Sequence, residues 1–233
     1  LNYSTGQTIM DQRTTYSNGV ELNNWDFSHK GAMTLRTALV YSRNTTALQT
    51  FKAVGETNIK SFLNNLDIQI KNDGQDYLVE SNSIGADISP IKMAAAYATF
   101  GNYGTYSKPY TVRKVTTRDG QVTEFKPEQK QAMKDSTAYM ITDVLKDSFK
   151  YGFATQATIP GLPTAAKTGS SNYTVEQKRA MGASDYEDII PDSWFIGYST
   201  DYTISAWTGY DNPYEQGGGV DTTEQEYSRL IYY

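Results

Sequence analysis

Three strand-like runs in the last third of the chain constrain the fold more than any other feature. They cover residues 164–171 (TAAKTGSS), 192–202 (DSWFIGYSTDY) and 202–211 (YTISAWTGYD). The last two meet at a tight turn near Thr200 and Asp201, and strands joined by so short a connection are antiparallel. Helical patterns dominate the chain before these runs. We therefore expect an α+β protein in which helices flank an antiparallel sheet.

Five segments combine a helical period with end signals. In one of them Ser89 is placed to cap the helix and Pro90 takes the first helical position. Thr34 is expected to cap the first of the five, and Asp135 or Ser136 the last. The expected helices cover residues 35–42, 45–54, 56–68, 90–101 and 135–152.

The segments around these helices carry weaker signals. Residues 108–126 alternate apolar and polar side chains around Asp119-Gly120, which predicts a β-hairpin with a two-residue turn. Residues 1–33 are polar and have no sustained period, so we expect a long loop there. Residues 224–233 resemble the opening of a helix.

Composition removes several kinds of chemistry. The net charge of −5, without a cluster of Lys and Arg, disfavours binding to nucleic acid. The chain has no cysteine, and its single histidine, His29, removes most Ser-His-Asp triads and His-rich zinc sites. We expect neither a metal ion nor a cofactor. Lysine is the obvious remaining base.

Ser42-Arg43-Asn44 lies between two expected helices and has two interpretations. A Ser and an Asn two residues apart in a short connection can point the same way, offering a proton-relaying hydroxyl beside an amide. Alternatively, Asn44 is a helix N-cap and Ser42 an ordinary turn residue at a helix end. The segment by itself favours the second interpretation.

Lys167-Thr168-Gly169-Ser170 also has two interpretations. Lys167 supplies positive potential, Gly169 lets a substrate backbone lie against the strand, and the hydroxyls of Thr168 and Ser170 can bind a carboxylate. The alternative is an ordinary strand whose lysine extends its charged end toward solvent.

Together the two motifs resemble those of the penicillin-recognising serine enzymes. That group carries Ser-x-x-Lys, a Ser-x-Asn-type motif and Lys-Thr-Gly, and here Lys-Thr-Gly begins 125 residues after Ser42 (167 − 42 = 125). The runs MAAAYATFGNYGTYSKPY and WFIGYSTDYTISAWTGYD further resemble class A penicillin-binding proteins, especially those of Gram-positive cocci. The family usually has Thr where this chain has Ser170.

The resemblance implies a transpeptidase that cross-links peptidoglycan stem peptides and is acylated by β-lactams. It implies that Ser42 relays a proton to the leaving group while Lys167 keeps the local potential positive. Asn44 would position the donor peptide. Thr168 and Ser170 would bind the terminal carboxylate, with the Ser170 N–H as half of an oxyanion hole and Gly169 allowing close approach.

The resemblance also implies parts that these 233 residues lack. Only Ser89 is followed three positions later by lysine, Lys92, and this pair lies downstream of Ser42 at a helix start. We therefore expect residues 1–233 to be the C-terminal part of one transpeptidase domain. The nucleophile helix, two further strands of a five-stranded sheet, a glycosyltransferase domain and a membrane anchor would lie upstream. The catalytic domain would then sit at the extracellular face of the cytoplasmic membrane, packed against an upstream fragment that carries Ser-x-x-Lys.

Two other interpretations stay open at this level. A Tyr-, Asn- and Thr-rich adhesin would explain the composition but not the paired motifs. A β-lactamase or a penicillin sensor would carry related motifs, yet it would hydrolyse the drug or signal its presence.

Overall fold

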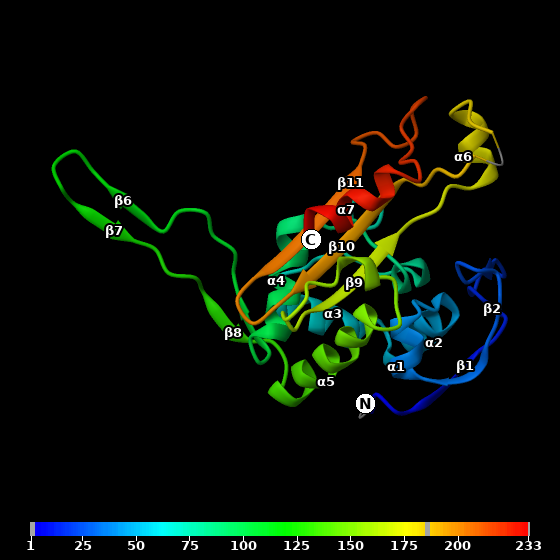
Figure 1. The fold of residues 1–233 in the computed structure, drawn as a ribbon, viewed down its shortest axis with the longest axis horizontal. Coiled ribbons are helices and arrows are strands. Elements are labelled where there is room, and N and C mark those ends of the chain that lie inside the picture. The colour runs from blue at the N-terminus through cyan, green and yellow to red at the C-terminus, as the bar shows by residue number, and fades with distance from the viewer. Residues whose placement is uncertain (1–2, 185–186, 233) are drawn as a thin grey trace.

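A three-stranded antiparallel sheet forms the centre of the molecule, in a computed structural model that describes residues 3–184 and 187–232. Its strands are β9 (Ala165–Ser170), β10 (Asp192–Tyr198) and β11 (Thr203–Gly209), in the order β11-β10-β9 (Figure 1). All three coincide with the expected strand-like runs, and the tight turn after β10 is also confirmed. The expected α+β architecture with an antiparallel sheet is confirmed.

Helices cover both faces of this sheet because the side chains of β10 alternate between them. On one face Phe195 and Gly197 lie under Tyr232 of α7 (Glu224–Tyr232). On the other face Tyr198 packs edge-on against Tyr97 of α4 (Pro90–Gly101) and shares a 2.8 Å hydrogen bond with a threonine of α5 (Asp135–Lys146). Figure 1 shows α7 in front of the sheet and α4 behind it.

The helix boundaries largely follow the sequence signals. The Thr34 hydroxyl accepts a hydrogen bond from the Thr37 N–H, so the expected cap of the first helix is confirmed. Ser89 takes the N-cap position of α4, and Pro90 is its first residue. The remaining helices are α1 (Leu35–Val40), α2 (Asn44–Val54), α3 (Glu56–Asn65) and α6 (Val175–Ala180), together with 3₁₀ turns at Glu80–Ser83, Asp147–Phe149 and Thr155–Ala157.

Several expectations about helix ends were wrong. The helix expected over 35–42 ends at Val40. The N-cap of α5 is Lys134, because Asp135 is already helical and its carboxylate accepts from the neighbouring Ser136 N–H instead. The helix expected over 56–68 ends at Asn65, where Asp67 adopts a positive φ of 52°. The helix expected over 135–152 becomes a 3₁₀ turn after Lys146. The short helix α6 was not expected at all.

The N-terminal segment is not the long loop that its composition suggests. It contains β1 (Thr8–Asp11), which pairs with β4 (Gly31–Thr34), and the two-residue strands β2 (Thr14–Thr15) and β3 (Glu21–Leu22), which pair with each other. These strands are too short to show a period in the sequence. They carry a buried carboxylate, Asp11, that ties the segment to the rest of the domain.

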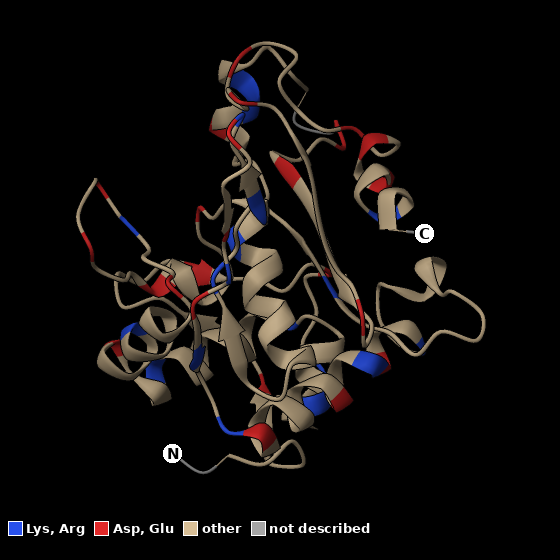
Figure 2. Ribbon diagram, turned by 90° about the vertical axis from the view of Figure 1, so that its left-hand side faces the viewer, with Lys and Arg blue, Asp and Glu red and all other residues tan. Residues whose placement is uncertain are grey.

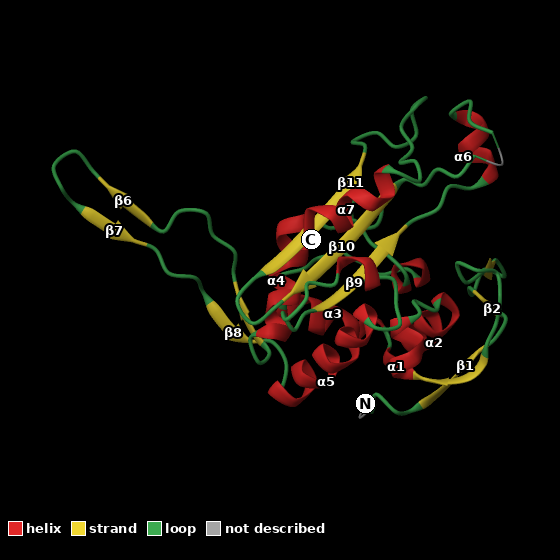
Figure 3. Cartoon of the chain, viewed as in Figure 1, coloured by secondary structure: helices red, strands yellow, loops and turns green. Residues whose placement is uncertain are grey.

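The expected hairpin is present and projects away from the body of the molecule (Figures 1 and 3). Strands β6 (Lys114–Thr116) and β7 (Val122–Glu124) pair, and Gly120 takes a φ of 86° at the tip. The connection is one residue longer than the expected two-residue turn, because the Thr117 N–H bonds to the Gln121 carbonyl across three residues. At its base β5 (Thr105–Ser107) pairs with β8 (Gln129–Gln131).

Charged residues of both signs are interspersed along the chain, on helices, strands and loops (Figure 2). Among residues 3–184 and 187–232, no helix has the length and apolar character needed to cross a bilayer.

Candidate active site

Ser42 lies where helix α1 ends, in a conformation that usually belongs to glycine. Its φ is +52°. The N–H of Ser42 bonds to the Leu39 carbonyl, and the N–H of Arg43 reaches back to the Ala38 carbonyl. This pair of bonds is the Schellman arrangement, whose left-handed position is normally glycine. The interpretation of Ser42 as a residue of a helix-ending turn is therefore confirmed.

The fold brings Lys167 to Ser42 across 125 positions of sequence. The Lys167 Nζ donates to the Ser42 Oγ over 2.8 Å and to the Thr168 carbonyl over 2.7 Å. Lys167 lies directly opposite the buried Ile196 of β10, and opposite residues of an antiparallel pair share one face. Its side chain therefore emerges on the face that carries α4 and α5, at the level where α1 ends.

The ammonium group of Lys167 occupies a poorly solvated place. Burial lowers the pKa of Lys167 from 10.5 to about 8. In the part of the chain that the structure describes, no carboxylate forms an ion pair with it. A lysine of this kind releases and accepts a proton near neutral pH more readily than a surface lysine does.

Asn44 is the first residue of α2, two positions after Ser42. Its side-chain amide donates to the Asn23 carbonyl over 2.9 Å. The alternative interpretation of Asn44 as an N-cap is wrong, because Arg43 occupies the cap position and α2 begins at Asn44. In Ser42-Arg43-Asn44 the Ser42 hydroxyl thus contacts Lys167, and the Asn44 amide contacts Asn23 of the N-terminal segment.

Thr168, Gly169 and Ser170 continue β9 beyond Lys167, along an edge that no other described strand covers. The Thr168 carbonyl accepts from the Lys167 ammonium, so it faces the site and not β10. Backbone groups two residues apart in a strand point the same way, which directs the N–H of Ser170 to the same free edge. Gly169 and Ser170 are exposed. The edge thus offers backbone donors and acceptors to an extended ligand.

Several buried groups around the motif were missed by the sequence reasoning. Asp11, Asn24 and Arg43 are almost completely buried, and Arg43 forms ion pairs with Asp11 (2.9 Å) and Asp26 (3.0 Å). Burial alone would raise the pKa of Asp11, but hydrogen bonds to its carboxylate and the charge of Arg43 hold it below its ordinary value. The one signal in the sequence was an arginine inside a motif flanked by apolar helices, since such a charge needs partners.

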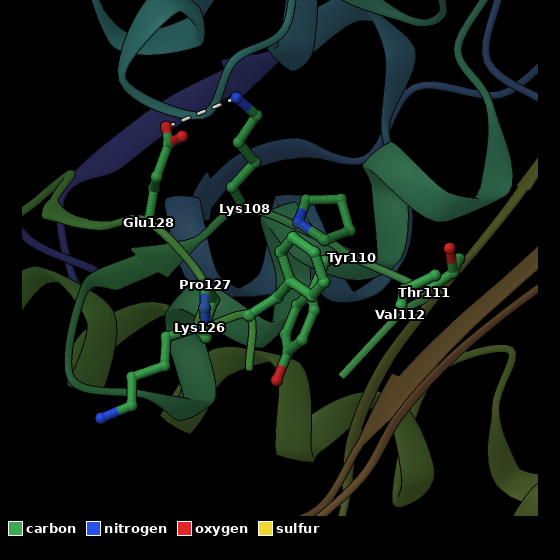
Figure 4. A pocket seen from close by; sticks show the side chains of 9 residues that line it. Lys108, Tyr110, Thr111, Val112, Lys126, Pro127 and Glu128 are labelled. Carbon is green, nitrogen blue, oxygen red and sulfur yellow. Dashed lines mark hydrogen bonds and ion pairs between the residues drawn. The ribbon is translucent and has the colours of Figure 1, made fainter. Parts of the chain in front are cut away.

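Two shallow depressions lie elsewhere. One, of about 360 Å³, sits at the base of the projecting hairpin between Lys108–Val112 and Phe125–Glu128 (Figure 4). The other lies along α3. Neither contains a residue of the Ser42–Lys167 site. Among the described residues, no group of three or more metal-binding side chains is gathered.

Ser42→Gly is expected to stabilise the fold relative to Ser42→Ala by about 1 kcal/mol, because glycine removes the left-handed strain while both variants lose the hydroxyl. Chemical unfolding of the two variants in the full-length protein measures the difference. Equal stability, or a more stable alanine variant, would show that the turn carries no strain.

Gly169→Ala is expected to leave stability unchanged yet slow the reaction with an extended ligand by about tenfold or more, since small misplacements of reacting groups cost up to about 10²-fold. A methyl group there would meet only the Trp194 Cβ, at an ordinary 3.6 Å. Thermal unfolding and acylation kinetics test both halves. The matched control is Gly85→Ala, where an added Cβ would meet nothing within 4 Å; similar kinetics in both variants would contradict the prediction.

Comparison with known proteins identifies the family of the chain. Residues 2–226 match the family described as "Penicillin binding protein transpeptidase domain". The chain is 38% identical over 99% of its length to penicillin-binding protein 1A/1B of Bacillus subtilis, and 37% identical over 99% to penicillin-binding protein 1A of Streptococcus pneumoniae. It spans 25% and 33% of these two relatives.

Solved structures give the same result for the fold. Penicillin-binding protein 1A of Haemophilus influenzae superposes with a TM-score of 0.76 at 19% identity, covering 99% of this chain and 38% of that one. PonA1 of Mycobacterium tuberculosis in complex with penicillin V superposes with a TM-score of 0.74 at 21% identity, covering 88% and 54%. The resemblance seen in the two motifs is confirmed: the chain belongs to the penicillin-binding protein transpeptidase family.

Proposed function

We propose that this chain is the C-terminal part of a serine D,D-transpeptidase that cross-links peptidoglycan stem peptides and is acylated by β-lactams. The observation that carries the proposal is the 2.8 Å hydrogen bond between Lys167 and Ser42. Lys167 belongs to the Lys-Thr-Gly motif and Ser42 to the Ser-x-Asn motif, so the bond joins the two motifs. Family membership and the identity to Gram-positive penicillin-binding proteins 1A support it.

In the first half of the proposed reaction, a serine of Ser-x-x-Lys, upstream of residue 1, attacks the carbonyl carbon of the penultimate D-alanine. The peptide C–N bond breaks, and the terminal D-alanine leaves as an amine after receiving a proton. Ser42 passes that proton on, with Lys167 beside it holding the local potential. The low pKa of Lys167 suits this position, because its proton can be shared with the Ser42 hydroxyl near neutral pH.

The same residues would hold the peptide in place. The hydroxyls of Thr168 and Ser170 would bind the terminal carboxylate, or the carboxylate of a penicillin. The N–H of Ser170 would donate to the developing oxyanion, and Asn44 would hold the donor peptide by its amide. In the second half, the amine of a second stem peptide attacks the ester carbon, the bond between that carbon and the serine oxygen breaks, and the proton lost by the amine returns to the serine.

We propose that the full-length protein adds an upstream glycosyltransferase domain and an N-terminal membrane anchor, which place this domain at the extracellular face of the membrane. The two 1A relatives are three to four times longer than this chain, which leaves room for such parts. The upstream portion would pack against α1 and α4 and complete the sheet beyond β11.

The test is covalent labelling of the full-length protein by a fluorescent penicillin, followed by mass spectrometry of the labelled peptide. We expect a stable adduct on a serine upstream of this chain. Absence of an adduct would overturn the proposal, and so would an adduct on Ser42. Rapid release of hydrolysed penicillin would instead indicate a β-lactamase.

A further inference from the structure

Arg43, the middle residue of Ser42-Arg43-Asn44, is an almost completely buried cation. Its guanidinium forms ion pairs with Asp11 and Asp26 and also donates to the Ser28 carbonyl. Its side chain is 2% exposed and that of Asp11 is fully buried. Two carboxylates on one buried arginine cost desolvation and are retained where geometry is needed.

Asp11 acts as the centre of this cluster. Its two carboxylate oxygens accept four hydrogen bonds from the protein: from Arg43 at 2.9 Å, from the Lys30 N–H at 2.9 Å, from Asn24 at 2.8 Å and from Thr45 at 2.6 Å. Thr45 follows Asn44 in the chain. One carboxylate therefore holds the residues on the C-terminal side of Ser42.

Residues on both sides of Ser42 are tied to the same N-terminal segment. Trp25 donates to the Tyr41 carbonyl at 3.2 Å, and Asn44 donates to the Asn23 carbonyl. Ser42 itself is bonded through its N–H to helix α1 and through its hydroxyl to Lys167. A left-handed serine persists only where its surroundings over-determine it.

We propose that Asp11, with Asp26, is a positioning residue: through Arg43 it holds Ser42 in its left-handed conformation and so keeps the hydroxyl beside Lys167. This inference rests on the proposed transpeptidase function. Residues 8–30 would then be the structural support of the proton relay.

The test uses Asp11→Asn in the full-length protein, with a penicillin as the probe. Two quantities are measured separately: the dissociation constant of the complex that precedes acylation (Kd) and the rate constant of acylation (k2). Both are normalised to the fraction of active protein, determined by titration. Asparagine has the shape of aspartate, but one of its two terminal atoms is a donor nitrogen, and the four groups bonded to Asp11 are all donors. We expect k2 to fall by about ten- to a hundredfold, since a small misplacement costs up to about 10²-fold, while Kd changes less than about twofold.

A double-mutant cycle distinguishes positioning from general damage. With Ser42→Ala already present, Asp11→Asn should lower k2 no further, because the hydroxyl it positions is gone. The matched control is Asp147→Asn. Asp147 is one of the two carboxylates that pair with Arg36, at the start of helix α1, whereas Ser42 follows the end of that helix. This variant should leave k2 unchanged.

Should Asp11→Asn fail to fold, Arg43→Lys keeps the charge and loses the planar fork, and the same loss of k2 is expected. If the wild-type protein is acylated and Asp11→Asn, or Arg43→Lys in its place, matches its k2, or if the loss is equally large without the Ser42 hydroxyl, this inference is wrong. If the wild-type protein is not acylated at all, the proposed function fails instead.

Discussion

Replacing Lys167 or Ser42 by alanine in the full-length protein is expected to slow β-lactam acylation by about 10²–10³-fold, the usual effect of removing one group that acts on charge or protons in a transition state. The physical reason is their direct contact at 2.8 Å, which joins a lysine of lowered pKa to a hydroxyl. Since each residue acts through the other, the double variant should lose little more than either single variant.

Stopped-flow measurement of acylation checks this prediction, with circular dichroism to show that each variant keeps the fold. The exposed Lys126 and Ser81 provide matched alanine controls, which should acylate at the wild-type rate. Near-wild-type acylation in Lys167→Ala or in Ser42→Ala would remove that residue from the site.

Lys167→Met is expected to stabilise the fold at pH 7 while it slows acylation by about 10²–10³-fold. Burial holds the folded-state pKa at about 8, below the ordinary 10.5. The folded protein thus binds fewer protons than the unfolded chain between pH 8 and 10.5, so this group makes stability rise with pH across that window. Below pH 8 the lysine is charged in both states, and the cost of burying it is present in full. Partial exposure limits the gain on substitution to the order of 1–3 kcal/mol.

The measurement is the free energy of unfolding of the full-length protein and its variant at several pH values from 7 to 10.5. We expect the difference between them to shrink as the pH rises. The exposed Lys126→Met variant is the reference for ordinary effects of replacing a lysine. A wild-type protein that matches or exceeds Lys167→Met in stability at pH 7 would contradict the prediction.

Local signals sufficed for much of the fold. Pro90 at the start of α4 and the strand patterns of β9, β10 and β11 each depend on neighbours within a few residues, so a sequence reveals them. The strands of the N-terminal segment could not be found in this way. They are held by Asp11, whose partner Arg43 lies 32 positions away, and a charge pair of that separation leaves no period in the sequence.

The candidate site, too, could be predicted only in part from the sequence. Its residues were chosen through a family resemblance, since each motif alone favours an ordinary structural interpretation. The contact between Ser42 and Lys167 agrees with that choice. The resemblance did not predict the left-handed φ of Ser42 or the buried ion pair between Arg43 and Asp11, because backbone strain and ion pairing follow from how distant segments pack.

The uncovered edge of β9 has a consequence for how such a protein can change over time. The main chain of a ligand that adds to this edge is recognised through peptide groups, which every sequence shares. The hydroxyls of β9 would bind a carboxylate that a natural peptide and its imitation have in common, so substitutions on β9 have little means of telling the two apart. Variants that separate the two must arise in the segments that border the edge, where side chains decide what fits.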